Sequence, residues 1–207
     1  RSEDGTEFDN SYDRGEPFTV QLGGGQVIKG WDQGLVGAKT GGQYQLDIPA
    51  DLAYGDQGAG ETIKPGDALT FVVDVRMVLH PSSADDQPDV DAPKSTGATE
   101  VATKDLVEGD GSEIVEGENV YLELIAFRGD TGEQVDTSWG KDGPWLLQLT
   151  EGQTLAGLVQ GIPGMKVGGR RQIIIPAADA FGSDGSQDGK IPANVDLVVV
   201  IDAVYAY

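Results

Sequence analysis

The sequence predicts a protein of the α+β class, built from two similar domains. The stretch Val27–Gly34 has a degenerate echo in Thr154–Gly161, 127 residues downstream. Around both stretches, segments in which apolar and polar residues alternate, as in half-buried strands, flank a short segment with helical spacing. Further matches at the same offset indicate an internal duplication. They are Gly5/Gly132, Asp9/Asp136, Ser11/Ser138, Pro17/Pro144, Gly41/Gly168, Gly42/Gly169, Pro49/Pro176 and Gly55/Gly182.

The length and the charge of the chain limit its function. The 207 residues, of which 38% are apolar, suffice for two domains of about 100 residues each. Fourteen Lys and Arg residues face 35 Asp and Glu residues, which gives a formal net charge of −21. This charge repels phosphate groups, so we expect no nucleic acid as a partner. No window is apolar for long enough to span a bilayer, so we expect no direct membrane insertion.

The chain has no cysteine and one histidine. Disulfides, thiol chemistry and Cys-ligated zinc are therefore not available, and we expect neither a metal nor a cofactor. The histidine, His80, lies between a strand-like run and a stretch rich in Pro, Ser and Asp, which predicts an exposed residue rather than a general base. An acidic, cysteine-free chain without an initiator methionine favours an extracytoplasmic location, in the cell envelope or secreted. A cytoplasmic location is the alternative.

The first copy predicts three strands and one short helix. Phe18, Val20 and Leu22 share one face of a strand over 17–22, which ends at three glycines. Residues 27–35 have helical spacing and allow one or two turns. A second strand over 44–48 ends at Pro49, and a third covers 69–79. The irregular segment 50–67 between them is of the length that functional or disordered loops have.

The composition of residues 81–98 separates the two copies. This segment is rich in Pro, Ser, Asp and Ala, which predicts a solvated acidic linker between a first domain at 1–80 and a second domain at 99–207. The second copy opens with strand-like runs at 101–106 and 120–127, and the counterparts of these runs would lie before Arg1. We therefore expect the first domain to lack its N-terminal strands.

An ordered set of aromatic, aliphatic and charged residues runs through the first copy. It comprises Phe8-Asp9, Arg14, Pro17-Phe18, Val27-Ile28-Lys29-Gly30-Trp31, Tyr54-Gly55, Ile63 and Leu69-Thr70-Phe71. This set resembles the FKBP-type peptidyl-prolyl cis-trans isomerases, the macrolide-binding immunophilins, in a tandem bacterial form. The resemblance covers nearly all of residues 3–79 and, more weakly, 100–207. It implies that each domain is a bent antiparallel sheet wrapped around one short helix.

The resemblance also implies a binding site and an activity. An apolar cleft between sheet and helix would bind proline-containing polypeptides and macrolide inhibitors. Trp31 would be its floor and Tyr54 would hang over its entrance. The substrate-binding residues would be Phe8, Phe18, Val27, Ile28, Trp31, Tyr54, Ile63 and Phe71. The catalytic groups would be the Tyr54 hydroxyl and the Ile28 N–H, which hold carbonyls of the substrate, and Asp9, a buried carboxylate paired with Arg14.

The chemistry of proline isomerisation agrees with this inventory. Rotation about an X-Pro bond faces a barrier of ~18–20 kcal/mol, but no bond has to break, so no nucleophile, metal or cofactor is needed. An apolar, water-poor cleft can favour the twisted amide over the planar one. Two alternatives remain open: a non-enzymatic, chaperone-like module that binds clients or partners, and a spacer of duplicated domains. Taken singly, the aromatic residues could be core residues, and Asp9 with Arg14 could be an exposed pair.

The second copy keeps the scaffold and loses most aromatic positions. Leu158 stands in place of Trp31, Phe181 in place of Tyr54, and Lys141 in place of Arg14. We expect a weakly active or inactive second domain. Its degenerate site would consist of Val135, Asp136, Trp145, Leu155, Leu158, Phe181, Ile191 and Val199.

Overall fold

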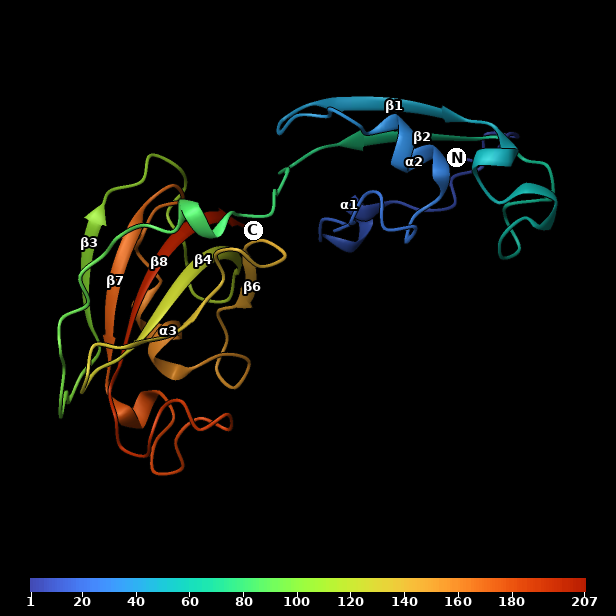
Figure 1. Ribbon diagram of the computed structural model, residues 1–207. Helices are drawn as coiled ribbons and strands as arrows, with labels where there is room; N and C mark the ends of the chain where they lie inside the picture. Colours follow the sequence, from blue (N-terminus) through green and yellow to red (C-terminus); the bar gives the residue numbers. More distant parts are fainter. The chain divides into compact units, whose positions relative to one another are not determined.

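The computed structural model describes residues 1–207 as two compact units, Arg1–Val78 and Leu79–Tyr207. Figure 1 shows mostly strands and loops, with a short helix beside the strands in each unit. The longest helices, α2 and α3, have six residues each, and neither could cross a membrane. The predicted α+β class is therefore confirmed.

The first unit has a two-stranded antiparallel sheet and one helix packed on it. Its core consists of Leu35, Leu46 and Ile48, which come from the helix end and from β1. Strands β1 and β2 pair from Gln43 opposite Asp74 to Ile48 opposite Leu69. The elements of the first unit are α1 (Ser11–Arg14), α2 (Lys29–Gly34), β1 (Gln43–Ile48), the 3-10 turns η1 (Ala50–Leu52) and η2 (Gly55–Gln57), and β2 (Leu69–Asp74).

The predicted strand over 17–22 does not form. In the second unit, the corresponding residues Trp145–Gln148 form β6, which pairs with the long strand β4 (Asn119–Arg128). The first unit contains no counterpart of β4, so residues 17–22 have no strand to pair with. The strand predicted over 69–79 ends at Asp74 for the same reason, because β8 continues to Ala206 along β4.

The second unit has a six-stranded antiparallel sheet. Its path is β3-β7-β8-β4-β5, and β6 pairs with β4 off this path. The elements of the second unit are η3 (Ala84–Asp86), β3 (Ala102–Val107), β4, β5 (Gln134–Thr137), β6 (Trp145–Gln148), α3 (Ala156–Gly161), β7 (Arg170–Ile175), η4 (Ala177–Asp179) and β8 (Leu197–Ala206). The main core lies between this sheet and α3 and includes Leu122, Leu158 and Ile201.

Residues 81–98 differ from the solvated linker that their composition predicts. They belong to the second unit, and Figure 1 shows this green segment running along the sheet to the end where β3 begins. Val90 and Ala92 pack against a second apolar cluster, formed by Ile125, Phe127, Val198 and Val200. A segment that is poor in apolar residues is ordered here because the sheet supplies most of the apolar surface. We call residues 81–98 the strap.

Candidate functional site

Four aromatic rings of the first unit gather at one place, although they come from four separate segments. The Trp31 ring makes edge-to-face contacts with Phe71 at 5.3 Å and with Phe18 at 6.0 Å, measured between ring centroids. Phe8 packs edge-to-face on Phe71 at 5.6 Å. Such pairs contribute about 0.5–1.5 kcal/mol each beyond area burial. We call Phe8, Phe18, Trp31 and Phe71 the aromatic cluster.

Local packing brings Trp31 to the sheet. Gly30, which precedes it in α2, is buried, and a Cβ at this position would lie 2.3 Å from Ile48 Cγ2 of β1. Only glycine allows the helix to lie this close to the strand. Ile28, Trp31 and Phe71 consequently pack as partly buried residues against the core of the unit. Phe18 stays 63% exposed, so one side of the aromatic cluster faces solvent.

The predicted catalytic groups, unlike the four rings, do not form a cluster of mutual contacts. Asp9 forms an ion pair with Arg14, but the two side chains are 57% and 50% exposed. The resemblance implied a buried carboxylate, and the structure instead shows the exposed pair, because no strand of the first unit covers it. Tyr54 is 42% exposed at the start of η2. The Ile28 N–H donates to no group of the chain, while the Ile28 carbonyl accepts from Trp31 and Asp32.

The remaining two predicted residues of the first copy are aliphatic. Ile63 is buried in a small bridge with Ala59, and Val27 is half-buried just before α2. One further contact was not predicted from the sequence: the Tyr12 hydroxyl donates to the carboxylate of Asp74. The hydrogen bond to Asp74 raises the pKa of Tyr12, and the bonds from Tyr12 and Gln43 lower the pKa of Asp74. This contact ties α1 to the end of β2.

In the second unit, the corresponding apolar residues are sealed into the core. Leu158, Ile191 and Val199 are at most 5% exposed. The partly buried residues packed around them include Val135, Trp145, Leu155 and Phe181. Leu158 and Val199 therefore place aliphatic side chains where Trp31 and Phe71 stand in the first unit, while Trp145 stands in the place of Phe18.

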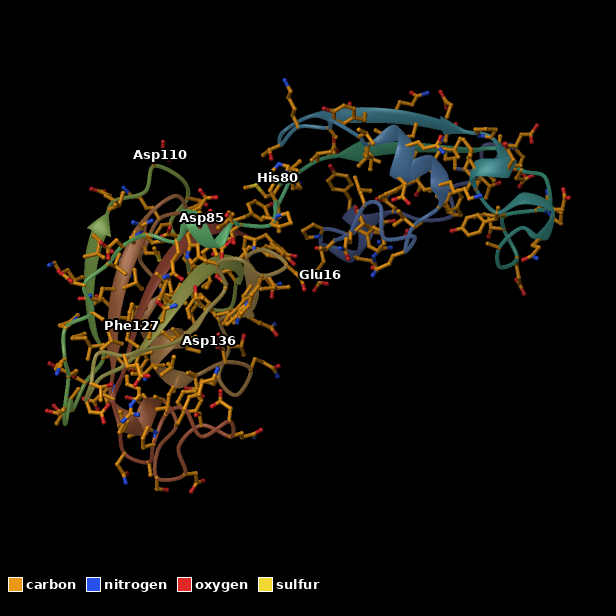
Figure 2. All side chains as sticks on the ribbon, viewed as in Figure 1. Glu16, His80, Asp85, Asp110, Phe127 and Asp136 are labelled. Carbon is orange, nitrogen blue, oxygen red and sulfur yellow. The ribbon has the colours of Figure 1, made fainter.

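The polar part of the second site is an ion pair over an indole ring. Lys141 Nζ lies 2.7 Å from Asp136 Oδ1 and 4.8 Å from the centroid of the Trp145 ring. Desolvation opposes the ionisation of Asp136, but the hydrogen bonds from Lys141 and from the Thr137 N–H hold its pKa below the ordinary value. Figure 2 labels Asp136. No cluster of three or more His, Asp or Glu side chains provides ligands for a metal.

The fold and the aromatic cluster define a class: small α+β domains with ring-lined surfaces between helix and sheet. The sequence profile of the family described as FKBP-type peptidyl-prolyl cis-trans isomerase matches residues 1–76 and 111–203. The chain belongs to this family, and the resemblance read from the residues is confirmed.

Three curated relatives illustrate the similarity. The chain is 33% identical over 201 residues to the mouse peptidyl-prolyl cis-trans isomerase FKBP10, which covers 97% of this chain and 32% of the relative. It is 41% identical over 119 residues to an FK506-binding protein of Streptomyces anulatus, over 58% of this chain and 96% of the relative. It is 53% identical over 76 residues to an FK506-binding protein of Neisseria meningitidis, over 37% of this chain and 70% of the relative. The chain thus spans about a third of the length of the mouse protein.

Proposed function

We propose that the chain is a peptidyl-prolyl cis-trans isomerase whose active site is the aromatic cluster of the first unit. The observation that carries this proposal is the convergence of Phe8, Phe18, Trp31 and Phe71, with Phe18 open to solvent. The rings provide an apolar surface on which a proline ring can pack. The free N–H of Ile28 lies at the start of the helix that carries Trp31, so it can donate a hydrogen bond to a carbonyl of the substrate.

The mechanism needs only differential binding. In the transition state the X-Pro amide is twisted and has lost its resonance, so its charge separation is smaller than in the planar form. An apolar surface that excludes water stabilises this less polar state relative to the planar one. The Tyr54 hydroxyl and the Ile28 N–H would hold the flanking carbonyls, and Asp9 would act on the imide through its charge. Each tenfold acceleration requires about 1.4 kcal/mol of such preference.

The role of the second unit follows from its sealed, aliphatic counterpart site. Leu158 and Val199 leave no ring surface where Trp31 and Phe71 stand in the first unit. We propose that the second unit is weakly active or inactive and binds extended polypeptide around Asp136, Lys141 and Trp145.

We also propose an extracytoplasmic location. Fractionation of a cell that makes the protein tests it, and recovery in the cytoplasm alone would count against it.

A matched pair of tryptophan substitutions tests which unit is active. Trp31→Leu in the 207-residue chain should lower kcat/KM on a proline peptide by more than about tenfold, and Phe71→Ala should act in the same direction. Trp145→Leu removes an indole from the second unit and should leave the rate nearly unchanged. A protease-coupled isomerisation assay measures these rates, and circular dichroism checks that the variants fold. Folded Trp31→Leu and Phe71→Ala variants with the rate of the unsubstituted chain would remove the aromatic cluster from the active site.

The competing function is a non-enzymatic module that binds client chains or a partner protein, with turnover incidental. The observation in its favour is that Asp9 is exposed rather than buried. A macrolide of the FK506 type, the ligand in the names of two relatives, separates the two functions. If the chain is an isomerase, the macrolide should suppress turnover and shift NMR signals near Trp31. Peptide binding without measurable turnover would favour the binding module.

A further inference from the structure

The strap covers an apolar outer face of the second unit's sheet. Val90 and Ala92 pack on Ile125 and Phe127 of β4 and on two valines of β8, with Ile174 beside them. A sheet with one solvated face would alternate polar and apolar residues, but β8 begins Leu-Val-Val-Val-Ile. The sheet therefore has two buried faces, and the strap covers the second one.

The carboxyl-terminal end of the strap is fastened by a buried carboxylate. Asp196 is 3% exposed, and its Oδ2 accepts hydrogen bonds from Ser95 Oγ and from the Ala98 N–H, both at 2.9 Å. The Ser95 N–H also donates to the Gly129 carbonyl at 2.9 Å. A Cβ on Gly129 would lie 2.4 Å from the Ser95 carbonyl oxygen, so the position requires glycine. This end of the strap is bound by charge-assisted hydrogen bonds, which are stronger than neutral ones.

The amino-terminal half of the strap contacts β5 and the loop that follows it. The side-chain amides of Gln87 and Gln134 exchange hydrogen bonds, at 3.1 and 3.3 Å. The Gly140 N–H donates to the Ser82 carbonyl at 3.1 Å. The Trp139 side chain packs into the apolar cluster that Val90 joins. The short turn η3, which carries the labelled Asp85 in Figure 2, lies between these two polar contacts in the sequence.

The segment that the strap contacts, β5 with its following loop, also carries the polar part of the second site. Gln134 precedes Asp136 by two residues on β5, and Gly140 immediately precedes Lys141. This segment thus contacts the strap just before Asp136 and again between Asp136 and Lys141, and Lys141 lies over Trp145. In the first unit, Asp9 and Arg14 occupy the corresponding positions.

We propose that the strap is a releasable brace of the second site, which holds β5 and its following loop so that Asp136, Lys141 and Trp145 keep their arrangement. Release of the strap frees the loop, separates the ion pair and weakens the binding of extended polypeptide. The proposal rests on the peptide-binding role of the second unit, and its structural part can be tested without any turnover. A segment with few buried apolar contacts opens locally at a low free energy, and the elements that move in regulation are of this kind.

Val90→Asp in the 207-residue chain tests the proposal, because it places a charge against Ile125 and Phe127. The control is Val115→Asp, which adds the same charge at a valine of the second unit that is 52% exposed and lies outside the apolar cluster that Val90 joins. Amide hydrogen exchange should become faster at Ser95, Ala98 and Gly140 in the first variant only. The pKa of Asp136, followed by NMR of its carboxyl carbon, should rise, because the desolvation that opposes its ionisation stays while Lys141 moves away, and only the Thr137 N–H and the weaker attraction of Lys190 still lower it. The affinity of the second unit for a tetrapeptide with a central Leu-Pro bond should fall about fivefold.

A milder variant keeps the test decisive if Val90→Asp unfolds the unit. Gln87→Ala removes only the reciprocal amide pair with Gln134, and it should produce the same changes at Gly140 and Asp136 with smaller size. The brace is overturned if strap amides exchange faster while the pKa of Asp136 and the signals of residues 134–145 stay unchanged. Absence of peptide binding in the unsubstituted second unit would instead refute its proposed function, and the Asp136 measurement would still decide on the brace.

Discussion

The two copies of the repeat share a helix-on-strand unit and differ in what surrounds it. Helix α2 corresponds residue by residue to α3, and β1 corresponds to β7, at the 127-residue offset. The first sheet has two strands, whereas the second has six and is covered by the strap on its outer face. The duplicated stretch therefore specifies the close packing of one short helix on one strand, in either setting.

Within the shared helix-on-strand unit, the two copies differ in side chains rather than in backbone. Trp31 in α2 builds a partly exposed aromatic cluster, while Leu158 at the same place in α3 is 5% exposed inside an aliphatic core. A ring cluster open to solvent suits ligand binding, and a sealed aliphatic core suits stability. The comparison predicts that stability and activity divide between the two units, and substitutions can break or sharpen this division.

The largest expected effect is on the stability of the second unit. Leu122 of β4 is fully buried, so Leu122→Ala should lower the free energy of unfolding of this unit by about 2–5 kcal/mol. Val72 of β2 is 64% exposed, so Val72→Ala should change the stability of the first unit by at most about 0.5 kcal/mol. Urea denaturation, followed by NMR signals assigned to each unit, measures both. A cost below about 1 kcal/mol for Leu122→Ala would show that the second core is not closely packed.

The next largest effect is the loss of stability when the glycine between helix and strand is replaced. It should be similar in the two units, because both pack a short helix closely on a strand. A Cβ at Gly157 of α3 would lie 2.1 Å from Ile175 Cγ2, as a Cβ at Gly30 would lie 2.3 Å from Ile48 Cγ2. Gly157→Ala and Gly30→Ala should each cost about 1–3 kcal/mol through overpacking, despite the better helix propensity of alanine. Gly152→Ala is the control, because its cost comes from backbone strain and not from packing. This glycine has a positive φ of 79°, and no atom lies within 4 Å of its Cβ position. Unequal costs at Gly30 and Gly157 would show that the two helices are not equivalent.

Much of the fold could be predicted because it follows from local patterns. Helix α2 lies within the predicted helical stretch 27–35, and β1 and β4 lie where alternating or apolar runs were found. The convergence of Trp31 and Phe71 came from the family resemblance rather than from spacing, because ring contacts between distant segments depend on the tertiary fold.

Two features could not be predicted from the sequence, for physical reasons. The strap has the composition of a linker, and its order depends on the apolar outer face of another segment. The signal was present in the partner rather than in the strap, since β8 begins with the continuous apolar run Leu-Val-Val-Val-Ile. The strand predicted over 17–22 has a suitable pattern, but a strand needs a neighbour, and the first unit offers none.

The smallest expected effect concerns the response of the two units to acid. The Arg171 guanidinium is 8% exposed, donates to Asp105, and also donates to carbonyls at the end of α3. The hydrogen bond from Arg171 lowers the pKa of Asp105 below its ordinary value. A carboxylate with a lowered folded-state pKa stabilises the fold above the unfolded-state pKa of about 3.9, and this stabilisation is lost as the pH falls through the folded-state value. In the first unit, Tyr44 takes the place of Arg171 and accepts a neutral hydrogen bond from the Lys39 N–H.

Asp105→Asn should therefore flatten the acid dependence of the second unit and leave the first unit unchanged. Because Asp105 is about half exposed, its contribution at neutral pH should stay below about 1 kcal/mol. Asp110→Asn, which removes a carboxylate that forms no salt bridge, controls for net charge. The free energy of unfolding of each unit, measured from pH 7 down to about pH 3, gives the slopes that linkage relates to bound protons. Equal slopes for the Asp105→Asn and Asp110→Asn variants would mean that the acid sensitivity comes from overall charge. The difference between Arg171 and Tyr44 would then contribute nothing to the acid dependence of stability.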